Sequence, residues 1–171
     1  MQPLLRDYRV GIVVPQAGIN TAQLASIDSR LTAIAKLLPA DGHIEVWVPG
    51  FNLADAEESV ARELCNLLER KPKVWAGYIP TVGDHKAGVA KHIVYQLGEA
   101  RRCDEIWCCP APGQTAHSNA RVAQVWRLGQ AGRHPARYKQ IPPWVETPTG
   151  TQPKKGKKSW RDMFNKGSFR W

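Results

Sequence analysis

Residues 8–15 read YRVGIVVP, a short β-branched run that ends in a proline and is followed by a helical pattern from Thr21. The same unit recurs at residues 44–50 (IEVWVPG), 74–80 (VWAGYIP) and 105–110 (EIWCCP). Strands that alternate with helices predict an α/β fold with a parallel sheet. In open parallel sheets, ligands bind at the edge where the carboxyl ends of the strands meet. The repeat therefore predicts the fold class and the position of a site.

The segments between these runs carry apolar residues three and four positions apart, the spacing of one buried helix face. We expect four helices: one from Thr21, one that follows Asp55, one over about 87–100 and one over about 119–130. Their expected buried residues are Leu24, Ile27, Leu31, Ile34, Leu38, Val60, Leu64, Leu67, Leu68, Val89, Ile93, Leu97, Val122, Val125, Trp126 and Leu128. Residues 138–141 predict a short final strand. The expected architecture is a Rossmann-like three-layer sandwich with a mainly parallel sheet of about five strands.

The chain has 171 residues, of which 43% are hydrophobic, enough for one sizeable core. We assign residues 1–145 to this domain. Residues 146–171 are expected to form a flexible tail, because their Pro, Thr, Gly and Lys content leaves too few apolar residues for a core. No apolar run approaches the roughly 18 residues of a membrane span, and the N-terminus lacks a signal-peptide pattern. A soluble, cytoplasmic protein is expected.

The four cysteines show no CxxC or Cys/His spacing, so buried reduced thiols are expected. Cys108 and Cys109 are adjacent in a predicted strand, where neighbouring side chains point to opposite faces. His43, His85 and His134 have no partners at a spacing typical of a metal site. The sequence thus predicts neither a metal nor a cofactor.

The net charge of +9 is concentrated in the tail, where residues 152–171 hold seven basic residues and one acidic residue. Aromatic residues are interspersed among these cations in a segment that is too poor in apolar residues to form a core. Cations combined with aromatic rings suit single-stranded nucleic acid, an anionic membrane surface or an acidic protein groove. The tail residues expected to contact such a partner are Lys154, Lys155, Lys157, Lys158, Trp160, Arg161 and Trp171.

Three turns, taken in order, carry a resemblance to a known family. They read PGFNLAD at residues 49–55, KAGVAKH at residues 86–92 and PGQT at residues 112–115. Over about residues 9–141, this order resembles the YspA-like branch of the Smf/DprA and LOG (SLOG) superfamily of Rossmann-like domains. That branch has a glycine-rich turn ending in Gly-Ala-Asp, and here Phe51 and Leu53 replace glycines. It also has Arg-Asn where this chain has Lys91 and His92.

The resemblance implies a nucleotide or nucleotide-derived ligand over the carboxyl ends of the strands. The expected ligand-binding residues lie in the four turns and at the helix starts that follow them: Gly18, Gly50, Asp55, Lys86, Gly88, Lys91, His92, Gly113, Thr115 and Ser118. In the fourth turn, Gly113 and Thr115 run into a helix N-terminus, whose amides and dipole favour a phosphate. Lysine ammonium groups would neutralise the phosphate charge.

Catalysis is weakly supported by the sequence. Related LOG phosphoribohydrolases carry a glutamate in the late helix, but this chain has no acid between Glu105 and Glu146. Cleavage of a glycosidic bond requires a carboxylate, which Asp55, Asp84 or Glu99 would have to supply. Two functions therefore lead: a nucleotide-binding SLOG-like domain, and a nucleic-acid-binding protein that uses its tail. A nucleotide N-glycosidic hydrolase is a third. Homo-oligomer formation is left open by the sequence.

Overall fold

The computed structural model describes residues 7–15, 17–51, 55–81, 88–111 and 113–141. The strands are β1 (Asp7–Val13), β2 (His43–Phe51), β3 (Val74–Thr81), β4 (Glu105–Cys108) and β5 (Tyr138–Gln140). The helices are α1 (Thr21–Leu37), α2 (Asp55–Leu68), α3 (Val89–Tyr95) and α4 (Arg121–Ala131). A π-helical turn, η1 (Gln96–Ala100), follows α3, and a 3₁₀ turn, η2 (Pro135–Arg137), precedes β5. None of the described helices is long and apolar enough to cross a membrane.

The five strands form one sheet in the order β3-β2-β1-β4-β5, and every neighbouring pair is parallel. The order reverses beside β1, because the chain adds β2 and β3 on one side of it and β4 and β5 on the other. In the register, Val10 lies opposite Val46 of β2, and Ile12 lies opposite Trp107 of β4. The predicted α/β class, parallel sheet and strand number are confirmed.

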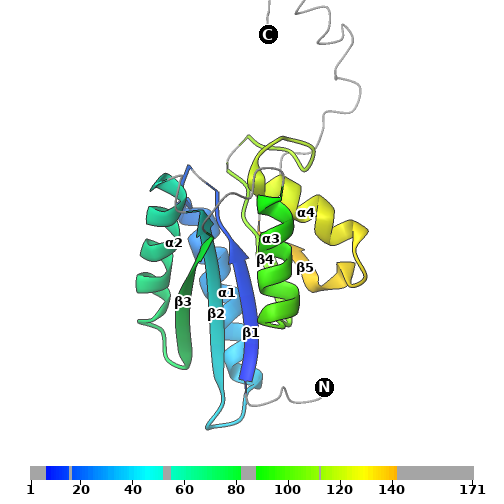
Figure 1. Cartoon of the computed structure of the whole chain (residues 1–171). Coiled ribbons are helices and arrows are strands. Elements are labelled where there is room, and N and C mark those ends of the chain that lie inside the picture. The colour runs from blue at the N-terminus through cyan, green and yellow to red at the C-terminus, as the bar shows by residue number, and fades with distance from the viewer. Residues whose placement is uncertain (1–6, 16, 52–54, 82–87, 112, 142–171) are drawn as a thin grey trace, which may run out of the picture.

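Helices cover both faces of the sheet, with α1 and α2 behind it and α3 and α4 in front of it in Figure 1. The first core lies between the sheet and α1 and α2, and contains Val10, Ile12, Val46, Trp107, Ile27, Leu31 and Leu64. The second core lies against α3 and α4, and contains Val13, Ile106, Ile93, Leu97, Val122 and Val125. Cys108 belongs to the second core and Cys109 to the first, which confirms that they point to opposite faces.

Several details differ from the sequence-based expectation. Leu67, expected on the buried face of α2, is 36% exposed, and Trp75, which its strand position predicts as a core or sheet-face residue, is 45% exposed. β3 is an edge strand, and the ring of Trp75 packs edge-on against Trp47 at 4.9 Å between centroids. The helix expected over 87–100 is α-helical only to Tyr95, where the π-helical turn begins.

Two local sequence features explain how closely the central strand is packed and where the first helix ends. Gly11 of β1 allows a close helix approach, because a Cβ there would lie 2.8 Å from a methyl group of Leu97. The helix α1 ends before Pro39, and Leu38 takes the extended conformation that a following proline favours. The predicted tail at 146–171 lies outside the described residues.

Candidate functional site

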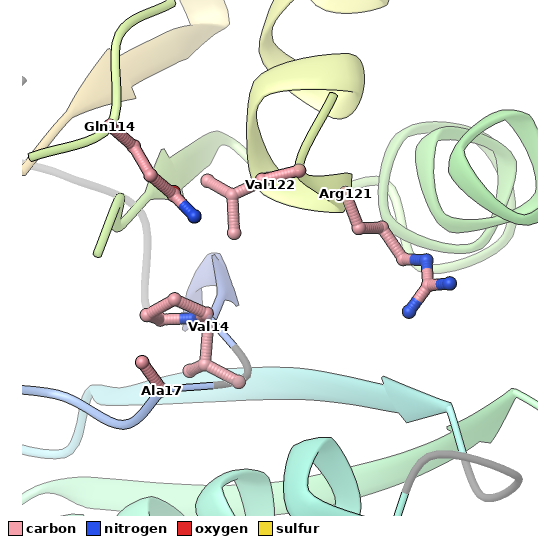
Figure 2. Close-up of a pocket in the computed structure, with 7 residues that line it drawn as sticks. Val14, Ala17, Gln114, Arg121 and Val122 are labelled. Carbon is pink, nitrogen blue, oxygen red and sulfur yellow. The ribbon is translucent and has the colours of Figure 1, made fainter. Parts of the chain in front are cut away.

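A pocket of about 280 Å³ lies where the strand order reverses, at the carboxyl ends of β1 and β4. Open α/β sheets bind ligands at this topological switch point. The pocket is lined by Val14, Pro15 and Ala17 after β1, and by Gln114, Ala120, Arg121 and Val122 after β4. Figure 2 shows Val14 and Ala17 on one side of the space and Gln114 and Val122 on the other.

The loop after β1 is fixed by a capping box at the start of α1. The Oδ1 atom of Asn20 accepts a 2.7 Å hydrogen bond from the backbone N–H of Gln23. In return, the Oε1 atom of Gln23 accepts a 3.2 Å bond from the backbone N–H of Asn20. These two bonds satisfy backbone donors that would otherwise lack partners at the first turn. Side chains of α1 and its N-cap thus satisfy the N–H groups of Asn20 and Gln23 at this helix end.

Gln23 also joins the two loops that form the pocket. Its side chain is fully buried, and its Nε2 group donates a short hydrogen bond to the backbone carbonyl of Pro110, just after β4. Gln23 is the buried polar residue of the described core. Buried polar groups require partners, so this bond both satisfies the amide and fixes the spacing of the two loops.

The loop between β4 and α4 is held by its own polar contacts. Gln114 accepts a 3.0 Å bond from the backbone N–H of Ala111 through Oε1. The guanidinium group of Arg127 donates two 2.8 Å bonds, to the carbonyls of Ala116 and Ser118. The hydroxyl of Thr115 accepts from the N–H of His117 at 3.2 Å. Arg127 therefore ties this loop to the second turn of α4.

The N-terminus of α4 differs from that of α1 because its N-cap is Ala120, which makes no side-chain capping bond. The first main-chain bond at this end runs from the N–H of Gln124 to the carbonyl of Ala120. The N–H groups of Val122 and Ala123 precede that bond, and first-turn donors of this kind have no partner within the helix. They lie at the positive end of the helix dipole, beside the pocket that Arg121 and Val122 line.

Two further groups add donor character to the pocket. Arg121 contributes a positive charge, and Figure 2 shows its side chain along the side of the pocket away from Gln114. The amide nitrogen of Gln114 points into the space between the loops, while its oxygen is held by Ala111. Among the described residues that line the pocket, none is an Asp or a Glu. This lining favours an anion.

The fourth predicted turn lies beside this pocket, although its predicted residues are not among the lining residues described. Gly113 has φ +88°, a left-handed conformation that favours glycine, and it precedes Gln114. Thr115 and Ser118 direct their hydroxyls to the N–H groups of His117 and Ala120. Gly113, Thr115 and Ser118 therefore shape the loop, whereas Gln114 and Arg121 line the pocket.

The residues predicted in the first and second turns, Gly18, Gly50 and Asp55, are not among the residues that line this pocket. Gly18 has φ +101° and lines a groove between α1 and α2. Gly50 lies opposite Pro80 in the β2–β3 pair, and its carbonyl accepts a 3.3 Å bond from the hydroxyl of Tyr78. Asp55 is the first residue of α2.

The third predicted turn is described only in part. Gly88 is the N-cap of α3, Lys91 is exposed, and the His92 ring stacks against Tyr95 at 6.5 Å between centroids. None of the three is among the residues that line the switch-point pocket. Lys86 and the tail residues from Lys154 to Trp171 lie outside the described part of the chain.

Sequence reasoning missed the residues that build the pocket. Gln23 had a readable signal, because Asn20 followed three residues later by Gln is a capping-box pattern. Arg121 was not predicted as a pocket residue because the helix was expected to start at about 119. The helix begins at Arg121, so its N-cap is Ala120. Gln114 carries no motif, and its role depends on the spacing that the fold imposes.

The cysteines near this edge of the sheet are not reactive groups. Burial raises the pKa of the Cys109 thiol to about 12, although the nearby Arg30 charge lowers it. Burial also raises the pKa of Cys108 well above its ordinary value. A thiol must ionise to act as a nucleophile or a metal ligand, so neither residue supplies one near neutral pH.

Comparisons with protein-family models, with curated proteins and with solved structures found no match to this chain. The resemblance to the SLOG superfamily therefore stays a prediction. The fold and the geometry of the pocket follow from this chain's own residues.

Proposed function

We propose that this domain binds a nucleotide or nucleotide-derived ligand at the switch point, with a phosphate group at the N-terminus of α4. The observation that carries the proposal is the combination of an uncapped helix N-terminus, the Arg121 charge and no carboxylate among the described lining residues. Backbone N–H groups at a helix N-terminus and a guanidinium group are typical ligands of phosphate oxygens.

The size of the pocket favours a small ligand. Its volume of about 280 Å³ lies just below the roughly 300–1,000 Å³ range of small-molecule sites. A mononucleotide, with its phosphate on α4 and its sugar or base against Val14 and Ala17, matches this scale better than a dinucleotide.

Binding is proposed in preference to hydrolysis. A glycosidase requires a carboxylate that acts as nucleophile or base, and the described lining offers none. Arg121 and Gln114 can bind and orient an anion, but neither group is a base near neutral pH. The proposed role is therefore that of a ligand-binding or sensor domain.

Isothermal titration calorimetry of the full chain with the four nucleoside 5′-monophosphates, their nucleosides and inorganic phosphate tests the proposal. We expect at least one monophosphate to bind and its nucleoside to bind at least tenfold more weakly. Arg121→Ala should weaken that binding about tenfold, because a charge-assisted hydrogen bond contributes roughly 1.5 kcal/mol. Arg133→Ala, which changes an exposed arginine outside the pocket, is the matched control. Equal binding of nucleoside and nucleotide would contradict the proposal.

A second candidate function is nucleic-acid binding by the tail, favoured by the alternation of Trp160, Phe164 and Trp171 with lysines and arginines. Neutralised phosphates release counterions, so the logarithm of affinity should fall steeply with the logarithm of salt concentration. Fluorescence anisotropy of a labelled single strand, with the full chain and with a chain truncated after Val145, measures this slope. Equal binding by both proteins would reject the tail as the nucleic-acid element.

A further inference from the structure

Three side chains of types that bind metals lie together at the amino-terminal ends of β1 and β2, at the opposite end of the sheet from the pocket. Asp7 of β1 lies directly across from His43 of β2 in the parallel register. Glu45 lies two residues beyond His43, so both side chains are on the same face of the strand. One ligand atom from each residue lies within 4.8 Å of the others. Asp7 and His43 are far apart in the sequence, which explains why spacing gave no sign of this cluster.

The imidazole of His43 stands between the two carboxylates. Its Nδ1 atom is 3.2 Å from Oδ1 of Asp7, and its Nε2 atom is 3.8 Å from Oε2 of Glu45. A histidine that donates its Nδ1–H to a carboxylate presents a lone pair at Nε2. In that tautomer, a nitrogen lone pair faces a carboxylate oxygen, and a metal ion between the two would accept electron pairs from both.

The other oxygen of Glu45 is already engaged. Its Oε1 atom is 3.4 Å from Nε of Arg9 and accepts a 3.3 Å hydrogen bond from Nε1 of Trp47. These contacts orient the carboxylate and leave Oε2 toward His43. Zinc bonds to nitrogen and oxygen are about 2.0–2.2 Å long, so two of them span up to roughly 4 Å. The 3.8 Å gap between Nε2 and Oε2 accommodates such an ion.

We infer that this cluster binds a divalent transition-metal ion of the Zn²⁺ class, with His43 Nε2 and Glu45 Oε2 as ligands. Asp7 is the positioning residue, because an outer carboxylate that accepts the second imidazole N–H fixes the tautomer of a metal-bound histidine. The side chains of His43 and Glu45 are 44% and 21% exposed, which leaves room for water as the remaining ligands. The Arg9 charge, 3.4 Å from Glu45, offsets part of the attraction, so we expect weaker binding than at a site with no neighbouring cation.

This site is independent of the proposed nucleotide pocket, and its position joins β1 to β2 at the amino-terminal edge of the sheet. A metal that binds only the folded chain raises its melting temperature with concentration. Calorimetry of the metal-stripped full chain with ZnCl₂, combined with thermal unfolding with and without Zn²⁺, is therefore the direct test. We expect one saturable site and a higher melting temperature with Zn²⁺.

Substitutions of the three residues test whether they form the Zn²⁺ site. His43→Ala and Glu45→Gln should each weaken Zn²⁺ binding at least tenfold and remove the rise in melting temperature. Asp7→Asn should weaken it less than His43→Ala, because it removes a positioning contact and not a ligand. His134→Ala, which replaces an exposed histidine outside the cluster, should bind Zn²⁺ as the unmodified chain does. Thermal unfolding of each metal-free variant shows that it is folded. Absence of saturable uptake, or uptake that His43→Ala leaves unchanged, would overturn the inference.

Discussion

The helices α1 and α4 start at the same edge of the sheet, after the two central strands, yet their first turns are different. At α1, Asn20 and Gln23 bond reciprocally to each other's backbone N–H groups. At α4, Ala120 offers no side chain to the first-turn donors. A capped end is satisfied within the protein, whereas an uncapped end beside a pocket retains donors for a ligand. We therefore expect a structural role for the first helix end and propose a binding role for the second.

The largest effect on stability is expected from Gln23→Ala. The change removes half of the capping box and leaves the carbonyl of Pro110 without its buried donor. Together these losses should lower the free energy of unfolding by about 3 kcal/mol. Urea denaturation measures it, with Gln124→Ala, which removes one exposed hydrogen bond to Asn119, as the matched control. A loss below about 1 kcal/mol for Gln23→Ala would show that the loops are not joined through this side chain.

A cap added to α4 should change stability and binding in opposite directions. In Ala120→Ser, the new hydroxyl can accept from first-turn N–H groups and should stabilise the domain by about 1 kcal/mol. The same bond competes with a phosphate for those donors, so nucleotide affinity should fall about fivefold, the equivalent of about 1 kcal/mol. Denaturation and calorimetry on one sample measure both changes. Tighter or unchanged nucleotide binding would break the contrast between the two helix ends.

The reciprocal change removes the cap of α1. Asn20→Ala should lower the free energy of unfolding by about 1 kcal/mol, because the N–H of Gln23 loses its acceptor. Nucleotide affinity should stay within twofold of the unmodified chain, since the ligand contacts are assigned to α4. The same two measurements apply, and a tenfold loss of affinity at unchanged stability would transfer the binding site to α1.

The smallest effect is expected from mild alkali. Burial raises the pKa of Cys65 to about 11 and those of Cys103 and Cys109 to about 12, from an ordinary value of about 9. A raised pKa contributes stability that is fully present below the unfolded value and is lost as the pH rises through the folded value. These thiols should therefore leave stability unchanged from pH 7 to 8.5 and lower it above pH 9. Thiolate absorbance in the folded protein below pH 8.5 would contradict the burial of these three cysteines.

The sequence predicted the architecture because each strand is a β-branched run and each helix has one apolar stripe. The runs at 8–15 and 105–110 form the neighbouring strands β1 and β4, so the end of the sheet where the pocket lies was predictable. Gly113, Thr115 and Ser118, which were predicted to bind the ligand, lie in the loop between β4 and α4, and their contact with a ligand stays a prediction. Their part in shaping this loop follows from local turn chemistry, which is readable from sequence.

The pocket itself was not predictable, because it depends on contacts between residues far apart in the chain. Gln23 meets Pro110 only when β1 and β4 pair, and Arg121 lines the pocket only because α4 starts two residues later than its apolar pattern suggested. Lys91 and His92 were assigned to the ligand from the family resemblance, and the fold places them on α3 outside the pocket lining. Exposure of Trp75 likewise depends on the position of β3 at the sheet edge.

The central claim is that the N-terminus of α4, and not that of α1, binds the phosphate. Amide chemical shifts of the ¹⁵N-labelled full chain, followed during titration with the nucleoside monophosphate that binds most tightly, test it most directly. The account predicts that the largest saturable shifts occur at the N–H groups of Arg121, Val122 and Ala123, with little change at Ala22, Gln23 and Leu24. Larger shifts at the first turn of α1, or saturable shifts confined to neither helix end, would contradict it.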